Sequence, residues 1–212
     1  MVRLLHELIL EQVNRRSDAA AIVHRQTVLD YAGLAQGIQA VAHGLLMFGL
    51  KRAERIAVYL PKRLETVLAL FGTASAGGVF VPINPLLKPE QVTYILRDCN
   101  VRILVTARDR ADLLNPYFAE CSDLHTLVLV DEATPPPNRY PVRAIGWQTL
   151  LTASDSRQPP RVIDVDMAAI LYTSGSTGKP KGVVLSHRNM LTGAQSVVEY
   201  LNKRPDDRIL AV

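Results

Sequence analysis

The chain has 212 residues, of which 48% are hydrophobic and 21% charged, and this composition excludes a disordered segment and favours a globular protein with a core. Its net charge of +4 comes without a long basic run, so the charge indicates no nucleic-acid partner and suits an anionic substrate. No apolar run is long enough for a membrane span, and the N-terminus is charged too early for a signal peptide. Cys99 and Cys121 lack metal-ligand spacing, so we expect a cytoplasmic protein with structural thiols.

The first quarter of the sequence predicts a helix, a hairpin and a second helix. Apolar residues recur at helical spacing from Leu4 to Val13, and Ala19–His24 with Gln26–Leu29 predict two short strands. Asp30 is placed to cap the second helix, and Gly49 is placed to end it. The apolar stripe of that helix predicts its core-facing side. The stripe consists of Tyr31, Leu34, Ile38, Val41, Leu45 and Phe48.

Strands and helices alternate in the middle of the chain. The predicted strands are Arg55–Leu60, Val79–Val81, Arg102–Thr106 and Thr126–Val130. The predicted helices are Lys62–Ala76, Pro89–Asp98 and Ala111–Cys121. This alternation predicts an α/β fold in which a mostly parallel sheet is flanked by helices.

The last third predicts two more strands around a polar loop, with irregular segments before them. The irregular segments are the proline-rich loop Asp131–Pro141 and the polar linker Thr152–Arg161, and between them Trp147–Leu151 predicts a short helical or extended piece. The later elements are strands Met167–Tyr172 and Val183–Leu185, helix His187–Asn202 and strand Arg208–Val212. Because the sequence ends within a predicted strand, we expect the chain to be part of a larger protein.

The segment between the last two buried strands has the composition of a phosphate-binding loop. Its glycines are expected to allow tight bends, so that backbone N–H groups converge on an anion. Its hydroxyls can donate to phosphate oxygens, and its lysines supply positive charge. The residues concerned are Thr173, Ser174, Gly175, Ser176, Thr177, Gly178, Lys179, Lys181 and Gly182. The spacing fits neither G-x-x-x-x-G-K-[ST] nor G-x-G-x-x-G, and a solvated linker is the alternative that the flanking strands disfavour.

This segment resembles the phosphate-loop signature of the adenylate-forming superfamily, which includes acyl-CoA synthetases, luciferases and peptide-synthetase adenylation domains. The family pattern, [ST]-S-G-[ST]-T-G-x-P-K-G, is matched at every fixed position from Thr173 to Gly182, and Lys179 occupies the variable one. Leu70–Pro85 resembles the family's A-G-x-x-x-V-P-x-N-P segment. The resemblance covers essentially the whole chain, and Leu185–Met190 is more similar to acyl-CoA ligases than to peptide synthetases.

The resemblance implies a truncated N-terminal portion of the AMP-binding domain. Residues 1–160 would form an α/β subdomain, and residues 161–212 the phosphate loop and the start of the next subdomain. The family's C-terminal domain and catalytic lysine lie beyond position 212, so we expect no catalytic residue here and an inactive fragment.

The resemblance also implies a reaction and its ligands. In the family a carboxylate attacks the α-phosphorus of ATP, pyrophosphate leaves, and a thiol, often that of CoA, takes the acyl group. This implies ATP, Mg²⁺, CoA and a small carboxylic acid as ligands, a role in fatty acid metabolism, and a homodimer. We expect Thr177 nearest to phosphate and Mg²⁺, and Lys181 to offset the pyrophosphate charge. His187 is expected near the acyl pocket, with a locally satisfied helix-start residue as the alternative.

Two alternatives to a carboxylate–CoA ligase stay open. A peptide-synthetase adenylation domain or an acyl-AMP ligase would share the first step and differ in its acceptor. A non-catalytic nucleotide-binding module would keep the loop without the chemistry. The acid pocket of the family lies mostly later in the chain, so the sequence does not name the acid.

Overall fold

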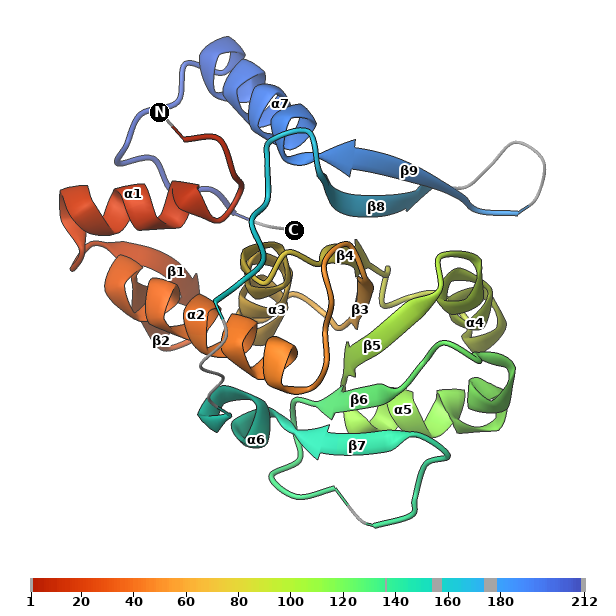
Figure 1. Ribbon diagram of the computed structural model, residues 1–212. Coiled ribbons are helices and arrows are strands. Elements are labelled where there is room, and N and C mark those ends of the chain that lie inside the picture. The colour runs from red at the N-terminus through yellow and green to blue at the C-terminus, as the bar shows by residue number, and fades with distance from the viewer. Residues whose placement is uncertain (1, 136, 154–157, 174–178, 211–212) are drawn as a thin grey trace.

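The protein is built around a mixed but mostly parallel sheet, shown in the computed structural model of Figure 1. The structure describes residues 2–135, 137–153, 158–173 and 179–210. Within these residues the main sheet has seven strands in the order β7-β6-β5-β3-β4-β8-β9. Neighbouring strands are parallel except for the antiparallel pair β8 and β9. The predicted fold class is therefore confirmed.

The elements follow the predicted alternation. The strands are β1 (Ala20–His24), β2 (Thr27–Asp30), β3 (Arg55–Tyr59), β4 (Val79–Pro82), β5 (Val101–Thr106), β6 (Thr126–Leu129), β7 (Arg143–Gly146), β8 (Met167–Thr173) and β9 (Lys181–Ser186). The helices are α1 (Glu7–Arg16), α2 (Tyr31–Met47), α3 (Leu64–Ser75), α4 (Pro89–Asp98), α5 (Arg108–Leu114), α6 (Trp147–Thr152) and α7 (His187–Tyr200), with a 3₁₀ helix, η1, at Asn115–Glu120.

The central strands are buried on both faces, which explains their almost continuous apolar sequence. In β3, Ala57 and Tyr59 belong to a core cluster with α4 and α5, whereas Ile56 and Val58 belong to one with α2, α3 and α6. Successive side chains of a strand point to opposite faces of the sheet, so one short strand contributes residues to the core clusters on both faces. Helices therefore cover the two sides of the sheet.

Helix α2 forms as its sequence predicts. The Asp30 carboxylate accepts a hydrogen bond from the Gly33 N–H at 2.7 Å, which satisfies one of the free donors at the helix start. Gly49 follows the helix with a φ of 91°, the left-handed conformation typical of a residue just past a helix end. The stripe residues Leu34, Ile38, Val41 and Leu45 are all buried. Of the helices in the described ranges, none is long and apolar enough to cross a bilayer.

Three local predictions are wrong. The single helix expected over Ala111–Cys121 is divided into α5 and η1, because Pro116 lacks the N–H that would continue an α-helix. Strand β7 was not expected, since its 4 residues are too few to show alternation. Arg208–Leu210 forms no strand, because a strand needs a neighbour and these residues are exposed; Ala211 and Val212 lie outside the described residues.

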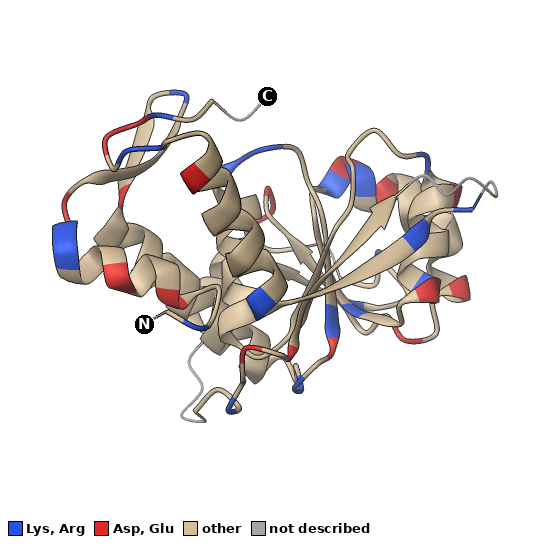
Figure 2. Cartoon of the chain, turned by 90° about the horizontal axis from the view of Figure 1, so that it is seen from above, with Lys and Arg blue, Asp and Glu red and all other residues tan. Residues whose placement is uncertain are grey.

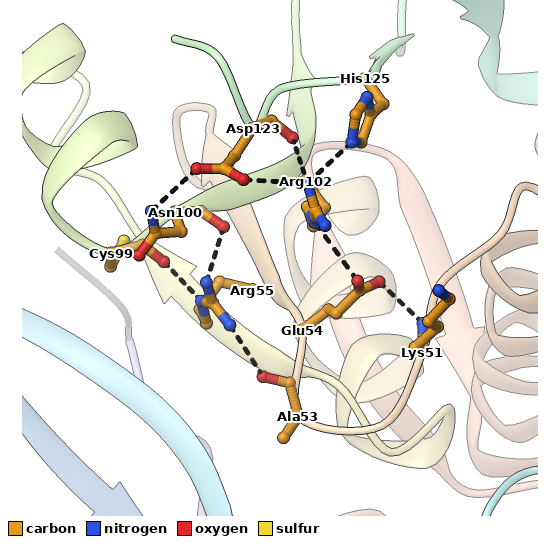
Figure 3. Close-up of polar contacts among 9 residues, drawn as sticks. All are labelled: Lys51, Ala53, Glu54, Arg55, Cys99, Asn100, Arg102, Asp123 and His125. Atoms are coloured by element: carbon orange, nitrogen blue, oxygen red, sulfur yellow. Dashed lines mark hydrogen bonds and ion pairs between the residues drawn. The ribbon is translucent and has the colours of Figure 1, made fainter.

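A polar network closes the amino-terminal edge of the sheet (Figure 3). The Arg102 guanidinium contacts Glu54 at 3.2 Å and Asp123 at 3.0 Å, and its Nη1 lies 2.8 Å from His125 Nε2. Arg55 donates to the backbone carbonyls of Cys99 and Asn100. These contacts tie together the starts of β3, β5 and β6. Seen from above in Figure 2, basic and acidic residues lie interspersed over helices and loops.

Candidate functional site

The predicted phosphate loop connects the two antiparallel strands β8 and β9. Thr173 pairs with Lys181 and Tyr172 with Gly182. These are the pairs nearest to the loop, and we call this end of the hairpin its mouth. Residues 174–178 lie outside the described residues, and with them Ser174, Gly175, Ser176, Thr177 and Gly178. The structure therefore brings the remaining loop residues, Thr173, Lys179, Lys181 and Gly182, to one end of the hairpin.

The two lysines at this mouth have different surroundings. Lys179 is exposed and its ammonium lies 5.9 Å from the centroid of the Tyr94 ring on α4. Lys181 is exposed, and among the described residues no carboxylate lies within ion-pairing distance of it. An uncompensated ammonium beside a segment rich in hydroxyls and glycines is available to an anion.

The expectation that Gly182 provides a backbone bend is wrong. Gly182 lies inside β9, paired with Tyr172. The described glycines with positive φ are Gly49 and Gly77. A Cβ at Gly182 would approach Tyr172 Cζ to 3.2 Å and Ile170 Cγ2 to 2.8 Å. The side chains of Tyr172 and Ile170 occupy the space that a side chain at this position would need. This crowding, and not the backbone conformation, explains why the residue is a glycine.

Helix α4 also contributes to this end of the hairpin, which the sequence did not indicate. The Tyr172 hydroxyl donates to Asp98 Oδ2 at 2.5 Å, and the Tyr94 hydroxyl donates to Asp98 Oδ1 at 3.3 Å. Burial and the Asp98 carboxylate raise the pKa of Tyr172, so the phenol stays a donor at neutral pH. The available signal is the spacing of Tyr94 and Asp98 on one helix face. Helix α4 follows β4 in the chain, and β4 pairs with β8 in the sheet. This pairing, which the sequence does not reveal, places the helix beside the hairpin.

His187 lies at the other end of β9, at the start of α7. Its side chain is fully buried, and Nδ1 accepts a hydrogen bond from the Leu5 N–H at 3.1 Å. The proton of the neutral imidazole is therefore on Nε2. The His6 ring packs edge-on at a centroid distance of 6.3 Å. This hydrogen bond joins α7 to the N-terminal segment, 182 residues away, while Nε2 is buried with no hydrogen-bond partner among the described residues.

Acid is expected to destabilise the protein through this histidine pair. Burial lowers the pKa of both His6 and His187 below the ordinary 6.5. The unfolded chain then binds more protons than the folded chain, so stability present at higher pH is lost as the pH falls below about 6.5. His187→Asn keeps an acceptor near the Nδ1 position and does not titrate. We expect its unfolding free energy to change less between pH 7.5 and 5.5 than that of the unmodified chain, by up to about 1.4 kcal/mol per pH unit.

The measurement is urea unfolding at the two pH values. Asp164, Asp166 and Glu7 also act on His187 and favour its charged form, but burial is the larger effect. The control is His43→Asn, because His43 is exposed on α2 and takes no part in the contact between His6 and His187. An equal acid sensitivity in His187→Asn and the unmodified chain would contradict the assignment.

Comparison with known proteins decides the family. The sequence profile of the AMP-binding enzyme family matches residues 9–212. The chain belongs to the AMP-binding enzyme family. This confirms the resemblance to adenylate-forming enzymes carried by the segment from Thr173 to Gly182.

Relatives of this AMP-binding chain include peptide synthetases and CoA ligases. It is 29% identical over 209 residues to gramicidin S synthase 2 of Brevibacillus brevis, covering 99% of this chain and 4% of that protein. The anthranilate CoA ligase AuaEII, solved with anthranoyl-AMP, superposes with a TM-score of 0.82 at 22% identity, over 92% of this chain and 37% of that one. VinN, solved with 3-methylaspartate, gives a TM-score of 0.77 at 26% identity, over 96% and 53%.

The AMP-binding chain thus spans only a small part of its curated relatives, and about a third to a half of the solved chains. Its fold is that of the N-terminal part of adenylate-forming enzymes. AMP-binding enzymes use ATP and Mg²⁺, which agrees with the predicted nucleotide.

Proposed function

We propose that the protein containing this chain is an ATP-dependent ligase that activates a carboxylic acid as an acyl-adenylate and transfers the acyl group to CoA. The observation that carries the proposal is the mouth of the β8–β9 hairpin. There the exposed Lys181 ammonium, unpaired among the described residues, adjoins the motif segment. Hydroxyl, N–H and ammonium donors in one short segment suit a polyphosphate.

Each loop residue has a proposed role toward ATP. The hydroxyls of Thr173, Ser174, Ser176 and Thr177, with the N–H groups near Gly175 and Gly178, would bind the β- and γ-phosphates. Lys181 would offset the charge of these phosphates as they leave. Mg²⁺, a hard cation that prefers oxygen ligands, would supply further positive charge there, and Thr177 is the residue that we propose nearest to it.

The proposed reaction needs positioning and charge more than covalent help from this chain. A carboxylate oxygen of the acid forms a bond to the α-phosphorus of ATP. The bond from that phosphorus to the β-phosphate oxygen breaks, and the electron pair leaves with pyrophosphate. The thiolate of the acceptor then attacks the acyl carbon, and AMP leaves.

A carrier-protein thiol is the second candidate acceptor. The favouring observation is the identity of 29% with gramicidin S synthase 2 over 99% of this chain. The similarity of Leu185–Met190 to acyl-CoA ligases favours CoA. Both candidates share the acyl-adenylate, so they differ only in the second step.

The test is ATP–pyrophosphate exchange by the full-length protein with a panel of carboxylic acids. We expect exchange with at least one acid, followed by thioester formation with CoA and none with a phosphopantetheinylated carrier. The 212-residue chain alone is expected to give no exchange. No exchange with any acid in the full-length protein would contradict the adenylation and favour a non-catalytic nucleotide-binding module.

Several finer expectations stay predictions. The prediction that His187 lies near the acyl pocket is tested with a His187→Asn variant of the full-length protein. The set of carboxylic acids that this variant accepts in the exchange assay is compared with the set that the unmodified protein accepts. The boundary near residue 160, the cytoplasmic location and the homodimer also stay predictions.

A further inference from the structure

Residues at both ends of the phosphate loop contact the same helix, α4. On the β8 side, the Tyr172 hydroxyl donates to Asp98 Oδ2 at 2.5 Å. On the β9 side, the Lys179 ammonium lies 5.9 Å from the Tyr94 ring centroid, within the range of a cation–π contact. Figure 1 shows α4 beneath the end of the hairpin where β8 stops and β9 begins.

The two contacts on α4 are linked to each other. Tyr94 and Asp98 are four residues apart, so they lie on one face of the helix, and the Tyr94 hydroxyl donates to Asp98 Oδ1 at 3.3 Å. The Asp98 carboxylate therefore accepts from both tyrosines, one from the helix and one from β8. Carboxylates on α4 and beyond it also line a cavity of about 630 Å³ that Lys179 borders, including Asp98, Glu120 and Asp123. Glu120 and Asp123 are paired with Arg97 and Arg102, so the carboxylates that favour an ammonium at this place are those of Asp98 and Glu90.

Gly182 makes the Tyr172 contact possible. A Cβ at Gly182 would lie 3.2 Å from Tyr172 Cζ and 3.4 Å from its hydroxyl oxygen. The Tyr172 ring therefore crosses the space that a side chain on β9 would fill. The last glycine of the motif lets a residue before the loop reach α4.

We propose that Asp98 and Tyr94 are positioning residues that hold the two ends of the phosphate loop, at Tyr172 and Lys179, on helix α4. This proposal rests on the proposed function, since it concerns the same loop. It assigns Lys179 to the anchoring of the loop, and Lys181 to the phosphates. An anchor that holds Tyr172 and Lys179 in place before nucleotide binds reduces the entropy cost of ordering these two residues on binding, so it favours ATP binding.

The first test needs no enzymatic activity. Hydrogen–deuterium exchange of the backbone amides of Lys179, Lys181, Gly182 and Val183 is measured in this chain without nucleotide. Tyr172→Phe removes one hydrogen bond to a carboxylate and is expected to speed this exchange about tenfold. The matched control is Tyr140→Phe, which removes a 2.8 Å tyrosine–aspartate bond to Asp112, away from the hairpin. Equal exchange in the two variants would overturn the anchor.

The second test uses the full-length protein and the ATP–pyrophosphate exchange. Tyr172→Phe and Asp98→Ala are expected to raise the KM for ATP about tenfold while the KM for the acid stays unchanged. Asp98→Asn keeps an acceptor for the Tyr172 hydroxyl, so it is expected to restore most of the affinity. A purely structural role would lower the unfolding midpoint and leave the KM for ATP unchanged, and that result would overturn the proposal. If no acid supports exchange, the proposed function fails and the amide exchange alone decides the anchor.

Discussion

Lys181→Ala in the full-length protein is expected to slow acyl-adenylate formation about 10- to 100-fold, because a charged donor to the leaving pyrophosphate is lost. The side chain is exposed at the hairpin mouth, so its removal leaves no buried group unsatisfied. Among the described residues it has no carboxylate partner, so stability should hardly change. The effect should appear in the rate of adenylate formation, measured in a single turnover with saturating ATP and acid.

A control substitution at another lysine distinguishes a contact with phosphate from the general effect of removing one positive charge. Lys203 is exposed after α7 and lies 3.9 Å from Asp207, far along the chain from the hairpin mouth. Lys203→Ala is expected to retain the full rate. Thr177→Ala carries the same expectation as Lys181→Ala, and an unchanged rate in both would rule out their contact with the phosphates.

The sequence predicts the layered fold well, since local patterns carry that information. The apolar strands Arg55–Tyr59 and Val101–Thr106 are buried on both faces as their composition requires. Asp30 caps α2, and Gly49 follows it with positive φ, because each effect depends on a few neighbouring residues. One exception is also local, since a single proline inside Ala111–Cys121 outweighed the helical pattern.

The contacts that surround the candidate site depend on the order of the strands, which no local pattern specifies. Asp98 and Tyr172 are 74 residues apart and meet because β4, which leads into α4, pairs with β8. Leu5 and His187, which meet across 182 residues, are likewise far apart in the sequence. The motif led to the correct family. The reason for its last glycine, the space taken by Tyr172, required the packed structure.

The same kind of argument identifies Gly44 as a glycine that does not tolerate a side chain. It lies in α2 where this helix crosses α6, and a Cβ there would approach the Leu150 carbonyl oxygen to 2.2 Å. That atom belongs to the backbone of α6, so it cannot turn aside as a flexible side chain would. Gly44→Ala is therefore expected to lower the free energy of unfolding by about 2–3 kcal/mol, despite the better helix propensity of alanine.

Gly193→Ala in α7 provides the matched control. Gly193 is also inside a helix, but nothing lies within 4 Å of the Cβ position there. Only helix propensity changes at this site, so the substitution is expected to stabilise the protein by about 1 kcal/mol. Urea unfolding of the two variants should thus give shifts of opposite sign. Stabilisation by both would show that α2 and α6 separate at little cost, contrary to the close backbone contact between Gly44 and Leu150.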